Sequence, residues 1–176
     1  MLYADVAGRV LLGIVFAIAC IGKVRSAAAF NAFAESLRDL GWLTGSARRA
    51  VAVAIPASEA AVVILLAVPA TALWGFAAGL SLLGALTIGA GIAIGRGQRV
   101  ECRCFGSTAK PMGTTELIRN GILIAIALAG LAAGLSARPG PVSATAMTLT
   151  AGIAWLGGLL IVGWDEIGYL ITANPA

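Results

Sequence analysis

Histidine is absent from this sequence of 176 residues, and charged and aromatic residues are scarce. Without histidine, imidazole is excluded as a general base, a proton shuttle or a metal ligand. Asp, Glu, Lys and Arg together make up 11% of the residues, whereas a soluble domain usually carries about a quarter. So few charges cannot cover the surface of a soluble domain. The mean hydropathy of +0.97 agrees with a chain whose main solvent is lipid.

The few charges lie between apolar runs, which is typical of the flanks of membrane helices. A nucleic-acid-binding domain would gather its basic residues on one soluble surface, so the net charge of +4 does not indicate such a partner. The first apolar run has no basic segment before it and continues into Lys23 and Arg25. That pattern favours a retained membrane helix over a cleaved signal peptide. The lipid bilayer is therefore the first partner that the sequence predicts.

Five apolar stretches approach the roughly 20 residues that a spanning helix needs. Their ranges are 6–22, 50–68, 70–95, 117–136 and 144–163. Within 26–42, Phe30, Phe33 and Leu37 follow helical spacing, which predicts an amphipathic helix in the membrane interface, with a polar connector as the alternative. The predicted fold is an all-α integral membrane protein with a single domain, 1–176. It comprises a four-helix transmembrane bundle, a fifth C-terminal transmembrane helix and one interfacial helix.

Glycine pairs at four-residue spacing lie inside the third and fourth spans. They are Gly75 with Gly79, Gly91 with Gly95, and Gly130 with Gly134. Small residues at this spacing let helix backbones approach closely in lipid. We expect these pairs to pack helices within the bundle rather than to form a dimer face, and the pattern sets no oligomeric state.

The sharpest local signal is the pair Cys102 and Cys104, which lies in the loop between the third and fourth spans. A disulfide between residues so close closes a small ring, and strained, exposed disulfides are the labile and catalytic ones. Arg103 between the cysteines and Arg99 before them would favour the thiolate form. The spacing therefore favours thiol–disulfide exchange, in which one cysteine attacks as thiolate and the other resolves the mixed disulfide.

Other interpretations of the cysteine pair stay open. The thiols could be inert, could form a structural staple that stabilises little because the loop is short, or could bind Cu(I) with Cys20 or Met112 as a third ligand. Two sulfurs without histidine make a weak metal site, so we predict no metal. The chain could also be a non-enzymatic membrane scaffold or subunit of the same fold, and whether it is an enzyme is left open.

Two further residues could belong to a site at the same membrane face. Cys20, near the end of the first span, is either a third redox partner or a small packing residue. Glu59 is the one charge deep within a predicted span, where a carboxylate is costly and normally faces a partner inside the bundle. Its candidate partners are Lys23 and Arg119. Glu59 could alternatively be protonated, which would make it a proton carrier.

Four motifs carry a family resemblance: Gly22-Lys23 at the end of the first span, Pro56-x-x-Glu59 in the second, Cys102-Arg103-Cys104-Phe105-Gly106 after the third, and Arg119-Asn120 at the start of the fourth. In this order they resemble the MauE family of methylamine utilisation membrane proteins, which is related to the DoxX-like four-helix group. The resemblance covers roughly residues 5–135 and leaves 144–163 as an extra transmembrane helix. The family usually has glycine between the two cysteines, whereas this chain has Arg103.

The resemblance implies a thiol–disulfide role at Cys102 and Cys104. The family acts beside a thioredoxin-like partner in maturing the disulfide-rich small subunit of methylamine dehydrogenase. For this chain it implies disulfide formation or electron relay for protein maturation, with a membrane quinone as a candidate cofactor and no certain one. The supporting residues would be Arg103, Phe105, Gly106, Arg119 and Asn120, together with Lys23, Glu59 and Cys20. We expect the first, third and fourth spans to bring Gly22-Lys23, the Cys102–Gly106 loop and Arg119-Asn120 together at one membrane face, with Phe105 buried between helix ends.

The distribution of basic residues predicts the orientation of the chain in the cell membrane. Of the twelve Lys and Arg residues, all except Arg9 and Arg138 fall on the side that carries the cysteine loop. By the positive-inside rule, Cys102 and Cys104 would face the cytoplasm. Disulfide formation would instead need the opposite face, because cytoplasmic thiols are kept reduced. We give the charge count more weight, so the protein would accept or relay electrons rather than oxidise exported chains directly.

Overall fold

Five helices of the protein are long and apolar enough to cross a membrane. The computed structural model describes residues 2–38, 45–96, 101–102, 110–111, 114–136 and 143–172, with side chains for all of these except 101–102, 110–111, 114 and 164–172. Within the described ranges, the spans are Leu2–Val24, Gly45–Ala67, Pro69–Gly95, Thr115–Leu135 and Ala144–Gly163. The predicted all-α membrane architecture is therefore confirmed, including the fifth C-terminal span.

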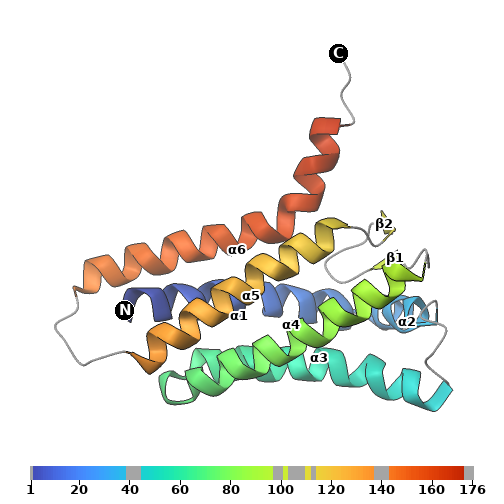
Figure 1. Ribbon diagram of the computed structural model, residues 1–176, viewed down its shortest axis with the longest axis horizontal. Coiled ribbons are helices and arrows are strands. Elements are labelled where there is room, and N and C mark those ends of the chain that lie inside the picture. Colours follow the sequence, from blue (N-terminus) through green and yellow to red (C-terminus); the bar gives the residue numbers. More distant parts are fainter. Residues whose placement is uncertain are drawn as a thin grey trace.

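Helix α1 lies at the centre of the bundle (Figure 1). It packs against α3, α5 and α6, while α4 packs between α3 and α5. The elements in chain order are α1 (Leu2–Val24), α2 (Ala27–Ser36), α3 (Gly45–Ala67), the short 3₁₀ helix η1 (Pro69–Thr71), α4 (Ala72–Gly95), β1 (Glu101–Cys102), β2 (Lys110–Pro111), α5 (Thr114–Leu135) and α6 (Ala144–Thr172). The two short strands pair antiparallel in the connection between α4 and α5.

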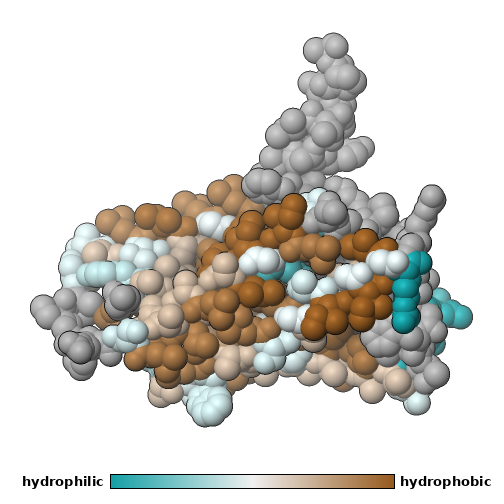
Figure 2. Space-filling model, viewed as in Figure 1, coloured by the Kyte–Doolittle hydropathy of each residue, from teal (hydrophilic) through white to brown (hydrophobic). Residues whose placement is uncertain are grey.

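A small apolar core fills the contact between α1, α3, α4 and α5. Phe76 of α4 is completely buried in it, and Leu12, Phe16 and Leu123 pack in the same cluster. Many other large apolar side chains point outward, as expected for helices whose surroundings are lipid. Figure 2 shows this apolar surface running along the helices, with the most hydrophilic residues gathered at one end.

Glycine makes room for the core at two of the three predicted pairs. The Phe76 ring lies so close to α5 that a Cβ on Gly130 would meet its atoms at 2.4 and 2.5 Å. A Cβ on Gly75 would meet Leu66 of α3 at 2.8 Å. The packing role is confirmed for these helix pairs, whereas a Cβ on Gly91 or its partner Gly95 would meet nothing within 4 Å.

The predicted amphipathic helix forms, but over a shorter range than 26–42. Helix α2 spans Ala27–Ser36, and Ser26 caps it by accepting a hydrogen bond from the Ala29 backbone N–H at 3.0 Å. Phe33 of α2 and Leu37, which directly follows the helix, are buried and pack against Ala52 of α3. The helix therefore closes one end of the α1–α3 contact, and residues 39–42 of the predicted range lie outside the described residues.

Helices α1 and α3 both begin earlier than predicted. The first span was predicted over 6–22, whereas α1 spans Leu2–Val24 and so includes Asp5. The second was predicted over 50–68, whereas α3 spans Gly45–Ala67 and so includes Arg48 and Arg49. A boundary predicted from hydropathy alone falls at the first charged residues of a span. A helix continues past them as long as the charged side chains reach water or a partner.

Candidate functional site

The buried polar side chains described in the bundle lie at the two ends of the α1–α3 contact. The buried charged residues among the described side chains are Asp5, Lys23 and Glu59. Lys23 lies in the last turn of α1 and Glu59 in the middle of α3, at the end of the bundle from which the cysteine loop emerges. This end contains the predicted site.

Lys23 and Glu59 form a buried ion pair. The Lys23 Nζ donates to Glu59 Oε1 at 2.7 Å, and the two side chains are only 1% and 3% exposed. Of the two partners considered for Glu59, Lys23 is therefore confirmed. Breaking such a pair by removing one member typically costs about 3–5 kcal/mol, because the other charge stays buried.

The two charges of the pair are satisfied unequally. The ammonium of Lys23 also donates to the Ala19 carbonyl at 3.1 Å and lies 5.4 Å from the centre of the Phe33 ring. On Glu59, Oε2 is buried and has no hydrogen-bond partner among the described residues. The protein thus surrounds the cation on several sides and the carboxylate mainly on one.

Helix α2 supplies the aromatic cover of this pair. Phe33 is 4% exposed and presents its ring to the Lys23 ammonium. An aromatic face attracts a cation, and the attraction is stronger when both groups are out of water. Phe33 was predicted to lie on an amphipathic helix, whereas its contact with Lys23 was not predicted. The signal was present in the helical spacing of Phe33 but needed the position of α2 relative to α1.

Cys20 lies one helical turn before Lys23 and faces the same neighbour. Its Sγ donates to the Pro56 carbonyl of α3 at 3.4 Å, and the thiol is free. Pro56 in turn lies one turn before Glu59. The face of α1 with Cys20 and Lys23 therefore meets the face of α3 with Pro56 and Glu59.

The cysteine loop begins with a short strand pair. Strand β1 contains Cys102, and the antiparallel register sets Cys102 opposite Lys110 of β2. The predicted site residues Arg103, Cys104, Phe105 and Gly106 lie outside the described residues. Their expected contacts with the first and fourth spans, and the burial of Phe105, stay predictions.

The predicted residues Arg119 and Asn120 lie in the second turn of α5. Both are half-buried, at the end of the bundle where the connection from β2 enters the helix. The structure thus brings Lys23, Glu59 and Cys20 into one group and puts Arg119 and Asn120 at the same end.

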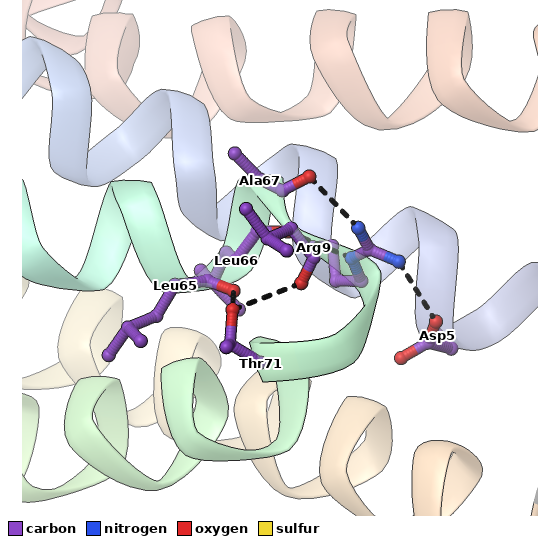
Figure 3. Close-up of polar contacts among 7 residues, drawn as sticks. Asp5, Arg9, Leu65, Leu66, Ala67 and Thr71 are labelled. Carbon is purple, nitrogen blue, oxygen red and sulfur yellow. Dashed lines mark hydrogen bonds and ion pairs between the residues drawn. The ribbon is translucent and has the colours of Figure 1, made fainter.

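A second polar cluster lies at the opposite end of the α1–α3 contact (Figure 3). Arg9 donates to the carbonyls of Leu66 and Ala67 at 2.9 and 3.3 Å and forms an ion pair with Asp5 at 3.6 Å. Thr71 of η1 donates to the Leu65 carbonyl at 2.9 Å. These donors satisfy the last carbonyls of α3, which have no partner within their own helix. This cluster was not predicted from the sequence, although the four-residue spacing of Asp5 and Arg9 could have indicated their ion pair.

The fold and the site together define a multi-pass helical membrane protein with a buried ion pair at the end of the bundle from which the cysteine-containing connection between α4 and α5 emerges. The family model of the methylamine utilisation protein MauE matches residues 1–133. The chain belongs to the MauE family.

Two relatives align with almost the whole chain. The methylamine utilization protein MauE of Paracoccus denitrificans is 32% identical over 171 residues, covering 96% of this chain and 89% of the relative. The protein of the same name from Paracoccus versutus is 32% identical over 170 residues, with the same coverage of 96% and 89%. No solved structure matches the chain. The alignments extend past the family model into α6, so the fifth span is part of the likeness.

Proposed function

We propose that this chain is a membrane thiol–disulfide exchange protein in which Cys102 and Cys104 form the reactive pair. The observation that carries this proposal is the common location of two unusual features. A Cys-x-Cys pair lies in the α4–α5 connection, at the end of the bundle where the apolar interior holds the Lys23–Glu59 ion pair. Buried charges inside a membrane bundle commonly mark a functional site.

The chemistry is an exchange between the pair and a partner disulfide. One cysteine attacks as thiolate, its sulfur bonds to one sulfur of the partner, and the other partner sulfur leaves as thiolate. The second cysteine then attacks the mixed disulfide and releases the partner as a dithiol. The partner is reduced by two electrons while Cys102 and Cys104 are oxidised to a disulfide, and the reverse sequence oxidises the partner. The register position of Lys110 opposite Cys102 supports thiolate formation, since basic neighbours favour it.

The partner class is a thioredoxin-like protein, and the role is electron transfer for the maturation of another protein. The relatives are named for methylamine utilisation, and we propose that this chain serves that pathway. A membrane quinone is a suitable cofactor for restoring the redox state of the pair. Ile21 and Val24 at the end of α1 are 60% and 52% exposed, so lipid-soluble rings meet an apolar surface at this end.

The location that we propose is the cell membrane, with the cysteine loop on the cytoplasmic side. Arg25, Arg49 and Arg96 are exposed at this end of the bundle, and basic residues concentrate on the cytoplasmic flanks of spans. An impermeant maleimide tests this in intact cells. Labelling of Cys102 and Cys104 only after the membrane is permeabilised supports the proposal, and labelling of intact cells contradicts it.

Thiol counting tests the redox function. The purified full chain is treated with a mild disulfide oxidant, and free thiols are alkylated before and after reduction. We expect two thiols to become protected, and this protection to disappear in Cys102→Ser and in Cys104→Ser. Cys20→Ser is the matched control and should still protect two thiols. Thiols at 102 and 104 that stay free under oxidant would refute the redox function and favour a scaffold. A stoichiometric copper content would favour Cu(I) handling instead.

A further inference from the structure

Three exposed arginines lie at the end of the bundle from which the α4–α5 connection emerges. Arg25 directly follows α1, Arg49 lies near the start of α3, and Arg96 directly follows α4. We call these three residues the arginine belt. None of them forms an ion pair within the described part of the chain, whose ion pairs use other basic residues. The fold does not use the charges of the belt, so they are available to a ligand outside the chain.

On α1 and α4, each arginine lies one helical turn beyond an exposed isoleucine. The Arg25 backbone N–H donates to the Ile21 carbonyl at 2.9 Å, so the last turn of α1 continues as far as this arginine. The Arg96 backbone N–H donates in the same way to the Ile92 carbonyl at 3.0 Å. Residues four apart in a helix share a face, and Ile21 and Ile92 are 60% and 40% exposed. Apolar surface and a cation therefore adjoin on the same side of each helix.

Helix α3 repeats this arrangement in the opposite chain direction. Val53 lies four residues further into the span than Arg49 and is 55% exposed. On three helices, the outward face thus has an apolar side chain within the span and a cation at its end. A phospholipid has the same order, because its acyl chains lie deeper in the bilayer than its phosphate. These faces fit a lipid better than a soluble anion, which would make no use of the apolar side chains.

The unpaired charge of the belt selects the class of headgroup. A zwitterionic headgroup carries its own cation, which the arginines repel, whereas an acidic headgroup brings a phosphate without one. A guanidinium group binds phosphate oxygens through two parallel N–H donors, and basic residues beside membrane spans attract acidic lipids. At the opposite end, the cation Arg9 is already bound by Asp5 and by the carbonyls of Leu66 and Ala67. The attraction should therefore act in one leaflet.

We propose that the arginine belt binds the phosphate groups of acidic phospholipids, whose acyl chains pack on the exposed apolar side chain one turn away from each arginine. The bound lipids then form part of the boundary of the bundle in the leaflet that contains the belt. This binding involves no covalent step and no cysteine, so it is independent of the proposed thiol exchange.

Spin-labelled lipids measure the preference on the full chain in phosphatidylcholine nanodiscs. A trace of spin-labelled phosphatidylglycerol or phosphatidylcholine is added, and the motionally restricted fraction gives the ratio of their association constants. We expect phosphatidylglycerol to be preferred about fivefold at each arginine, and the ratio to fall towards unity in high salt. Combined replacement of the belt by glutamine should abolish the preference, and an unchanged ratio in that variant overturns the proposal. Combined replacement by lysine should keep most of the preference, and its loss there contradicts a role of charge.

Arg38→Gln is the matched control, because Arg38 is an exposed arginine at the same end that already pairs with Glu35. It removes the same charge as Arg49→Gln and should leave the lipid preference nearly unchanged. An equal loss in the two variants would show that net charge alone attracts the lipid, which overturns the belt. Inorganic phosphate distinguishes the other source of the anion. If phosphate removes the preference at an ionic strength at which chloride does not, the arginines bind free phosphate and the lipid proposal is wrong.

Discussion

The buried ion pair between α1 and α3 permits a stability prediction that a double-mutant cycle can measure. The variants are Lys23→Met, Glu59→Leu and the combination of both. Each single variant leaves one charge in a site where the side chains are 1% and 3% exposed. The double variant removes both charges and fills the space with apolar atoms.

The contacts around each charge set the order of the losses. Removal of one partner of a buried pair costs about 3–5 kcal/mol, while apolar replacement of the whole pair is often nearly neutral. After Glu59→Leu, Lys23 keeps the Ala19 carbonyl and the Phe33 ring. After Lys23→Met, Glu59 loses the one donor that the structure records for it. We therefore expect Lys23→Met to cost more than Glu59→Leu, and the double variant to cost less than either.

Reversible unfolding in mixed detergent micelles, followed by circular dichroism, measures the four free energies. The exposed pair Glu35 and Arg38 provides the control, because its side chains are 65% and 55% exposed and its cycle should give less than about 1 kcal/mol of coupling. Losses from Lys23→Met and Glu59→Leu that add to within about 0.5 kcal/mol would show that the two charges are independent. That result would refute the reasoning from the 2.7 Å contact.

Three further predictions concern packing and capping. Gly130→Ala should destabilise the bundle by about 1–3 kcal/mol through overpacking against Phe76. A Cβ on Gly121 of the same helix would meet nothing within 4 Å, so Gly121→Ala should be neutral or stabilising. Thermal unfolding of the two variants compares these effects. Arg9→Met should cost about 2–3 kcal/mol in the same assay, because two carbonyls of α3 and one carboxylate lose a charged donor. Phe33→Leu keeps the apolar cover but removes the ring over the cation, and should cost about 0.5–2 kcal/mol that vanishes in a Lys23→Met background.

Hydropathy predicts the five spans but not which side of each helix faces protein. In a membrane the lipid-facing and protein-facing sides of a helix are both apolar, so the pattern has little contrast. The contact of Phe76 with Gly130 could not be predicted for this reason. Glycine spacing alone predicts a close approach of a neighbouring helix at Gly91 just as it does at Gly130. A Cβ added to Gly91, however, would meet nothing within 4 Å.

The polar part of the site was more predictable than the apolar part. A lone carboxylate in mid-span needs a partner, and Lys23 at the end of the preceding span was a candidate that the structure confirms. The Phe33 ring and the Cys20 contact with Pro56 could not be predicted, since both depend on how α2 and α3 turn relative to α1. The chemistry proposed for Cys102 and Cys104 rests on their spacing and on the family, and stays a prediction.

The central position of α1 has a consequence for the order of biosynthesis. Helix α1 precedes the other described spans in the chain and carries Arg9 and Lys23, two charges that are costly to place in lipid. Both find their interhelical partners on α3, the next span to emerge: the carbonyls of Leu66 and Ala67, and the carboxylate of Glu59. The charges of α1 can therefore be neutralised by the first two spans alone. The later helices α4, α5 and α6 can then assemble by apolar packing around α1 and α3, whose buried charges already have their partners.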